Sequence, residues 1–225
     1  MKTSAKYVIV GDFETGGLPN KNKRAFYDVP LCEIALCVVD LEKLEIVHEY
    51  NEIFAPHYKE GLEYEQGAFD ATGMSMELLE SKGINLRDIF RDIKGIFKKY
   101  KNNRQGCTLC GHNWVQFDMP FLRNMFEFFG DDVDSYVTFV VDTLMISHWS
   151  SLEQPNYKLG TCCELNGINL VGAHRALADT RANAELLIEY IKKLRGEGQN
   201  SVNVGEEKAS FRETFKLQIP NYSES

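Results

Sequence analysis

The sequence predicts an α/β fold in which a mixed β-sheet is flanked by helices. Two observations predict it. Three apolar, β-branched segments joined by short connections lie within the first 54 residues, as expected for strands that run antiparallel. Beyond residue 85, strand-like segments alternate with helical ones, a pattern typical of buried parallel strands. We therefore expect three initial antiparallel strands followed by parallel ones.

The individual elements follow from local patterns. Apolar, β-branched runs predict strands at 7–10, 31–39, 44–54, 107–112 and 139–141. Gly16 and Gly17 break the first run, and a loop continues to about Pro30. Asn85 is the expected cap of the first long helix. Apolar residues at three- and four-residue spacing predict helices at 86–100, 120–129, 159–165 and 177–194.

Composition and charge limit the classes of protein to which the chain can belong. The 225 residues suit one α/β domain, and no apolar run is long enough to span a bilayer. The N-terminus lacks the apolar segment and cleavage site of a signal peptide, so we expect a cytoplasmic protein without membrane contact. The net charge of −8 argues against a module that grips nucleic acid by bulk positive charge. It is neutral toward an enzyme whose acidic site holds metal.

Asp12 and Glu14 follow the first predicted strand at a spacing of two. Residues i and i+2 of a strand point to the same side, so two carboxylates would project together where α/β sites usually lie. Carboxylate oxygens are the ligands that Mg²⁺ and Mn²⁺ prefer. Such pairs are common, however, and this pair taken alone is better explained as a solvent-facing strand end.

Three further polar residues have local explanations of their own. Asp118 stands where a helix N-cap would be, with Pro120 in the first turn. His174 and Asp179 are five residues apart, too far in angle to share a helix face. We therefore expect His174 on a loop and Asp179 in the first turns of the last helix. There Asp179 is either a metal ligand or an acid favoured by the helix dipole, and this segment alone supports both interpretations about equally.

The three segments that contain these residues resemble, in order, the three exonuclease motifs of the DEDD superfamily, histidine subgroup. The segments are VGDFETGGL, GHNWVQFDMPFL and AHRALADTRANAELL. The resemblance runs from about Tyr7 to Leu194 and includes the CEIA segment at 32–35. The family includes the proofreading epsilon subunit of bacterial replicative DNA polymerase, ribonuclease T and oligoribonuclease. Three ordered motifs are far more specific than any one of them.

The resemblance implies a ribonuclease-H-like fold and a 3′→5′ exonuclease that uses two metal ions, Mg²⁺ or Mn²⁺. Carried over by position, the metal ligands are Asp12, Glu14, Asp118 and Asp179, and the general base is His174. Asp12 would bridge both metals. Glu14 and Asp179 would hold the metal that binds the attacking water, and Asp118 would serve the other. Two such metals stabilise the attacking and leaving oxygens, and a histidine can take the proton of water near neutral pH.

The candidate substrate contacts are Phe13, Thr15, Met74 and Asn113. Thr15 matches a motif position that meets the terminal nucleotide in relatives, and Met74 stands where a wedge residue would be. Core packing is the alternative role for Phe13. The chain departs from the family pattern at Thr72, which replaces the usual histidine, and at Gly16, which replaces the usual second threonine. Both departures concern substrate binding and leave the metal ligands intact.

We expect residues 1–195 to form the exonuclease domain and residues 196–225 a linker and C-terminal appendage. The preferred substrate is the 3′ end of single-stranded DNA, with nucleoside monophosphates as products and a role in proofreading or repair. The alternatives are a 3′→5′ exoribonuclease and, in another class, an inactive nucleic-acid-binding or scaffold module. The appendage contains Phe211, Phe215 and Leu217 and is a candidate docking segment for a DNA polymerase or a second subunit.

Overall fold

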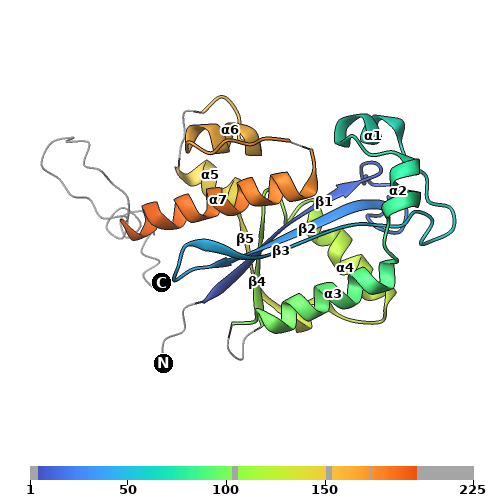
Figure 1. Cartoon of the computed structure of the whole chain (residues 1–225), viewed down its shortest axis with the longest axis horizontal. Coiled ribbons are helices and arrows are strands. Elements are labelled where there is room, and N and C mark those ends of the chain that lie inside the picture. Colours follow the sequence, from blue (N-terminus) through green and yellow to red (C-terminus); the bar gives the residue numbers. More distant parts are fainter. Residues whose placement is uncertain (1–4, 103–105, 151–153, 173, 197–225) are drawn as a thin grey trace, which may run out of the picture.

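The computed structural model describes residues 5–102, 106–150, 154–172 and 174–196. Five strands form one mixed sheet in the order β3-β2-β1-β4-β5 (Figure 1). The strands are β1 (Tyr7–Thr15), β2 (Leu31–Asp40), β3 (Glu45–Ile53), β4 (Cys107–Gly111) and β5 (Val137–Asp142). The first three pair antiparallel, whereas β4 runs parallel to β1 and β5 parallel to β4. The predicted order of antiparallel and then parallel strands is confirmed.

Helices cover both faces of this sheet. They are α1 (Gln66–Thr72), α2 (Met76–Lys82), α3 (Leu86–Lys99), α4 (Asp118–Phe128), the 3₁₀ helix Val133–Ser135, α5 (Thr143–Ser150), α6 (Leu159–Leu165) and α7 (Ala176–Arg195). In Figure 1, α5, α6 and α7 lie above the sheet, and α3 and α4 lie below it. The apolar patterns predict α3, α4, α6 and α7. They do not predict α1, α2 and α5, because each of these short helices buries at most one apolar residue and so shows little apolar periodicity.

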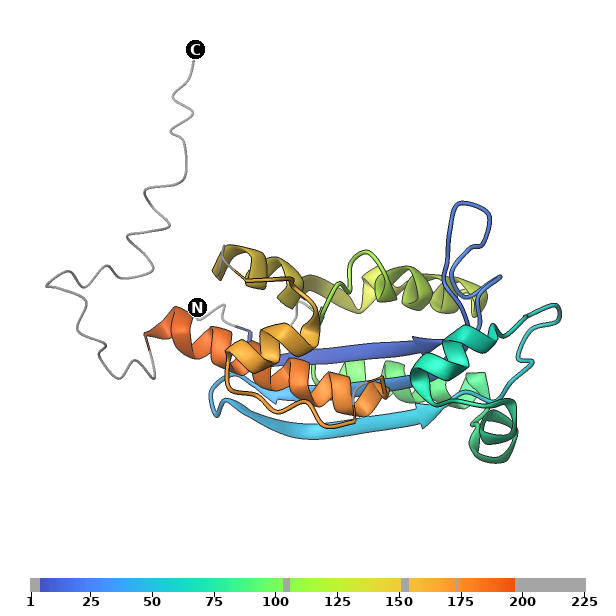
Figure 2. The ribbon, with the colours of Figure 1, turned by 90° about the horizontal axis from the view of Figure 1, so that it is seen from above.

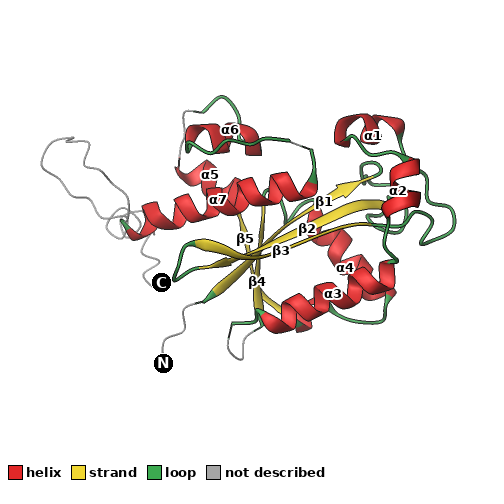
Figure 3. Cartoon of the chain, in the orientation of Figure 1, coloured by secondary structure: helices red, strands yellow, loops and turns green. Residues whose placement is uncertain are grey.

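Two arrangements of helices bear on the site. Figure 2, seen from above, shows α7 passing over the strands with α6 beside it, and α7 contacts both β1 and β2. Figure 3 shows α1 and α2 beside the end of the sheet toward which β1 points. No helix in the described part of the chain is long and apolar enough to cross a membrane.

Alternate residues of β1 point into two different hydrophobic layers. Ile9 lies in the large cluster shared with α3 and α4, whereas Val8 and Val10 lie in a cluster with the buried face of α7. Because side chains alternate along a strand, Asp12 and Glu14 continue the row of Val8 and Val10. Two carboxylates therefore lie on the α7 side of the sheet, directly after its apolar row.

Trp114 packs against the opposite side of the sheet and is 1% exposed. A Cβ at Gly11 would lie 2.8 Å from the indole Cη2, and a Cβ at Gly111 would lie 2.5 Å from Cε3. Both strands therefore need glycine where the indole lies against them. The indole also stacks on Phe13, with ring centroids 6.0 Å apart. This packing supports the end of β1 from the face opposite to α7.

Candidate active site

The acidic residues of β1 lie inside the strand rather than after it. β1 extends to Thr15, because Asp12 pairs with Ala35 and Glu14 pairs with Glu33 of β2. This ladder sets the direction in which both carboxylates project. The predicted same-side spacing is confirmed, but the predicted strand end at residue 10 is wrong. Acidic residues are depleted in strands, and here the pairing with β2 overrides that preference.

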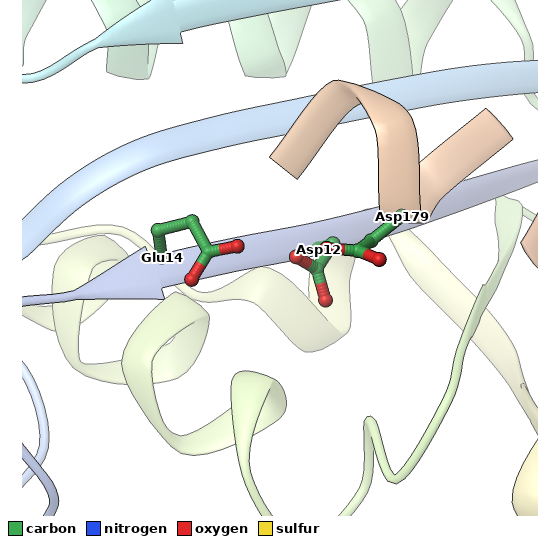
Figure 4. Close-up of side chains that lie close together, drawn as sticks. All are labelled: Asp12, Glu14 and Asp179. Atoms are coloured by element: carbon green, nitrogen blue, oxygen red, sulfur yellow. The ribbon is translucent and has the colours of Figure 1, made fainter. Parts of the chain in front are cut away.

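Asp12, Glu14 and Asp179 form a cluster of carboxylates between β1 and the start of α7 (Figure 4). One carboxylate oxygen from each residue lies within 4.8 Å of the other two. Asp179 lies in the first turn of α7, as the sequence predicts. Hard divalent cations take oxygen ligands of this kind.

Asp118 lies outside this three-residue cluster and has a different environment. It is 2% exposed, and its Oδ1 accepts a hydrogen bond from the backbone N–H of Phe13 at 3.0 Å. The expectation that Asp118 caps α4 is wrong, because Phe117 holds the cap position and Asp118 is the first helical residue. The helix starts at Asp118, two residues before the expected start at Pro120. The Asp118 carboxylate is thus free of capping and bonds to β1.

His174 precedes α7 on a loop, as predicted, and is exposed. Its φ of 67° is uncommon for a residue other than glycine. Its backbone N–H donates a hydrogen bond to Oδ2 of Asp179 at 2.7 Å. This bond ties the histidine loop to the carboxylate cluster.

Burial and mutual repulsion raise the pKa values of all four acidic groups. Loss of hydration is the main cause at each of them, and it raises the pKa of Asp12 and of Asp118 well above the usual range. Burial and the neighbouring carboxylates raise the pKa of Glu14 to about 7. Burial also raises the pKa of Asp179, although the backbone N–H of His174 opposes the rise. Several carboxylates that are poorly hydrated and close together are costly to ionise without a cation.

The donor set fits a divalent metal ion. Its carboxylate oxygens come from β1 and α7, converge on one place and repel one another. Arg175 is the cation that lowers the pKa of Glu14, but its guanidinium is bound to Glu33. A bound metal would supply the missing positive charge and would favour the ionised carboxylates. The cluster is therefore a candidate divalent-metal centre.

The candidate substrate contacts fall into two groups. Phe13 and Met74 are 3% and 4% exposed and pack in hydrophobic clusters, so their side chains face the protein core rather than a substrate. Phe13 does so because it belongs to the β1 row that faces α3 and α4. Thr15 lies at the end of β1 and is also buried, at 7% exposed, but it is polar, and its Oγ1 donates to the carbonyl of Gly17 at 2.7 Å. Asn113 follows β4, is half-buried and has a φ of 66°.

Gly16, a departure from the family pattern, has a steric reason. A Cβ at this position would lie 2.6 Å from Cδ1 of Tyr64 and 2.7 Å from Cγ of Pro30. The carbonyl of Gly16 accepts a hydrogen bond from the N–H of Glu65 at 2.7 Å. The segment that leads into α1 therefore packs directly against the chain after β1.

The sequence analysis did not identify Glu33 as part of the site. Glu33 lies opposite Glu14 in the β1–β2 ladder, is 1% exposed and forms an ion pair with Arg175. The signal was a glutamate inside the strand LCEIALCVVD, which is apolar elsewhere up to its final Asp40, because a buried carboxylate requires a partner. Its partner cannot be read from the strand itself.

Comparison with known sequences gives a consistent result. A family model named RNase_T and described as an exonuclease matches residues 9–187. The chain is 26% identical over 214 residues to the DNA polymerase III PolC-type of Caldanaerobacter subterraneus subsp. tengcongensis, covering 95% of this chain. It is 30% identical over 222 residues to the protein of the same name from Latilactobacillus sakei, covering 98% of this chain. The chain spans 14% of the length of each of these curated relatives.

Solved structures support the fold. The zinc-bound form of the E. coli ExoI–ssDNA complex matches with a TM-score of 0.69 and 20% identity, over 83% of this chain and 40% of that chain. E. coli Exonuclease I in complex with a dT13 oligonucleotide matches with a TM-score of 0.67 and 19% identity, over 84% of this chain and 41% of that chain. The expected ribonuclease-H-like mixed sheet flanked by helices is confirmed. Because the family model covers most of the chain and contains all three motifs, the chain belongs to the RNase_T exonuclease family.

Proposed function

We propose that this chain is a metal-dependent 3′→5′ exonuclease that hydrolyses single-stranded DNA and releases nucleoside monophosphates. The observation that carries the proposal is the carboxylate cluster of Asp12, Glu14 and Asp179 within an exonuclease-family chain. The PolC-type relatives and the likeness to a structure with bound single-stranded DNA favour DNA over RNA.

We assign Asp12, Glu14, Asp118 and Asp179 as ligands of two divalent metal ions, Mg²⁺ or Mn²⁺. The family resemblance implies that Asp12 would serve both ions, and the charges of the other three carboxylates all act on it. Glu14 and Asp179 share its cluster, while Asp118 approaches from α4. Metals bound here would stabilise the attacking and leaving oxygens of the phosphodiester.

His174 is the proposed general base. Its backbone is bonded to Asp179, which brings the residue beside the cluster, and it lies in contact with solvent. A neutral imidazole can remove the proton of an attacking water near neutral pH. The proposed contacts of the terminal nucleotide are Thr15, the last residue of β1, and Asn113, two residues after the adjacent parallel strand β4.

We also propose that residues 1–195 make up the exonuclease domain and that residues 196–225 form a linker and appendage. The family match to residue 187 and the end of α7 at Arg195 support this boundary. Phe211, Phe215 and Leu217 lie outside the described residues. Docking of this segment on a DNA polymerase or a second subunit stays a prediction. A pull-down with the chain truncated after residue 196, compared with the full chain, tests it.

The test of activity uses a single-stranded DNA oligonucleotide labelled at its 5′ end and an RNA of the same sequence. With Mg²⁺ or Mn²⁺ we expect a ladder of shortened, still labelled DNA, and we expect none with EDTA. A 3′ end blocked by phosphorothioate bonds should resist degradation, whereas immediate release of the labelled 5′ nucleotide would refute the direction. Degradation of RNA alone would favour the exoribonuclease. If neither DNA nor RNA gives a metal-dependent product, the inactive nucleic-acid-binding module becomes the favoured interpretation.

A further inference from the structure

Glu33 accepts four hydrogen bonds, and three of them come from Arg175 and Ala176 at the start of α7. The Nε and Nη2 atoms of Arg175 donate to its two carboxylate oxygens, each at 3.0 Å. Asn51 of β3 donates to Oε1 at 3.0 Å, and the backbone N–H of Ala176 donates to Oε2 at 3.3 Å. Glu33 is 1% exposed and lies opposite Glu14 in the β1–β2 ladder. The carboxylate thus connects β2 and β3 with the first residues of α7, next to the acidic pair of β1.

Arg175 lies between the two candidate catalytic residues of the third motif. It is the cap residue of α7 and follows His174 directly. Its carbonyl accepts a hydrogen bond from the N–H of Asp179 at 3.1 Å, and the N–H of His174 in turn donates to the Asp179 carboxylate at 2.7 Å. Binding of the Arg175 guanidinium to Glu33 on the sheet therefore also fixes the positions of His174 and Asp179.

We propose that Glu33 and Arg175 are positioning residues, which fix the first turn of α7 over β1 so that the third motif meets the first. The proposal rests on the proposed function of the carboxylate site. A bidentate arginine–carboxylate pair sets orientation as well as distance, which a single charged contact does not. The pair acts through His174 and Asp179 and needs no contact of its own with the substrate.

A purely electrostatic role makes a different prediction. Glu33 adds negative charge beside the carboxylate cluster and Arg175 adds positive charge. If charge alone mattered, Glu33→Gln would weaken metal binding and Arg175→Ala would strengthen it. A positioning role requires both substitutions to act in the same direction.

The experiment measures kcat and KM on a single-stranded DNA oligonucleotide, together with Mn²⁺ binding by calorimetry, for Glu33→Gln and Arg175→Ala. We expect kcat to fall roughly ten- to a hundredfold in each, as expected when a catalytic group is misplaced by about 1 Å, with KM little changed. Mn²⁺ binding should weaken in both. Added guanidinium should restore part of the kcat of Arg175→Ala and none of that of Glu33→Gln.

Folding is controlled separately, because Arg175→Ala leaves a buried carboxylate without its ion-pair partner. Arg175→Lys keeps the charge and loses the bidentate geometry, so it should show the same fall in kcat in a folded protein. Far-UV circular dichroism and urea unfolding of each variant show whether it is folded. Folded Arg175→Lys and Glu33→Gln proteins with wild-type kcat would overturn the proposal.

Arg181 and Glu49 supply the matched control. They form a second bidentate pair between α7 and the sheet, at 2.7 and 2.6 Å, and neither residue belongs to the carboxylate cluster. Arg181→Ala and Glu49→Gln should leave kcat and Mn²⁺ binding unchanged. If these variants lose as much kcat and Mn²⁺ binding as the variants of Glu33 and Arg175, then Glu33 and Arg175 only attach α7 to the sheet and do not position the site. If the wild-type chain shows no nuclease activity, the proposed function fails. The positioning role is then still supported if Mn²⁺ binding weakens in the Glu33 and Arg175 variants and not in the Glu49 and Arg181 variants.

Discussion

Replacing Glu14 by glutamine should stabilise the metal-free protein at pH 8 and abolish catalysis. Loss of hydration, with the charges of Asp179 and Glu33, raises the pKa of Glu14 from its ordinary value of 4.5 to about 7. The folded state therefore holds this proton more tightly than the unfolded state does. The contribution of this proton to the free energy of unfolding is fully present below pH 4.5 and is lost as the pH rises to about 7.

The magnitude follows from the same pKa difference. Each pKa unit corresponds to about 1.4 kcal/mol, so the rise from 4.5 to about 7 lowers the free energy of unfolding at pH 8 by about 3 kcal/mol. At pH 5 the loss is under about 1 kcal/mol, because this pH lies only half a unit above the ordinary pKa of 4.5. Glutamine has nearly the shape of glutamate and no charge, so it removes this loss. A gain of this size would raise Tm by roughly 6 to 12 °C in a domain of this length.

Urea unfolding in EDTA between pH 5 and pH 8.5 measures the effect, with Glu80→Gln on the exposed side of α2 as the control. The stability difference between Glu14→Gln and the wild type should grow with pH and level off above about pH 7. The control should show no such trend. A difference that is independent of pH, or a loss of stability at pH 8, would refute a poorly hydrated anionic cluster around Glu14.

Four further predictions concern the metal, the catalytic residues and the packing below them. Mn²⁺ should raise Tm more at pH 8 than at pH 5.5, because metal ligands must be deprotonated. Differential scanning fluorimetry measures this shift in Tm, and a shift that is the same at both pH values would mean that the carboxylates are not the ligands. Asp12→Ala should nearly abolish product formation in a folded protein, whereas near-wild-type turnover would exclude its bridging role. His174→Ala should lower kcat by roughly a hundredfold or more, and an unchanged kcat would mean that another group takes the proton. Gly11→Ala should lower the free energy of urea unfolding by about 1–3 kcal/mol, since its Cβ would lie 2.8 Å from Trp114 and 2.9 Å from Leu36. An unaltered urea midpoint would show that the indole can move aside.

Local sequence patterns predict much of the fold and the composition of the site. The apolar periodicity of α3 and α7 predicts these helices because it reports which face is buried, and the apolar, β-branched runs predict β2 and β3. The order of three motifs points to Asp12, Glu14, Asp118, His174 and Asp179, although each residue alone has an ordinary local explanation. The same patterns do not reveal how these residues are held relative to one another.

Tertiary structure decides the partners of these residues and the cost of their charges. Asp118 resembles a cap in sequence, yet its carboxylate bonds to Phe13, which only the packing of α4 beside β1 brings within reach. Glu33 resembles an anomaly in an apolar strand until α7 brings Arg175 to it from the other end of the domain. The amino-acid sequence determines which chemical groups are available and which local structures they favour. Their hydration, pKa values and alignment depend on sheet pairing and helix packing between distant segments, because these quantities are set by what surrounds each group in space.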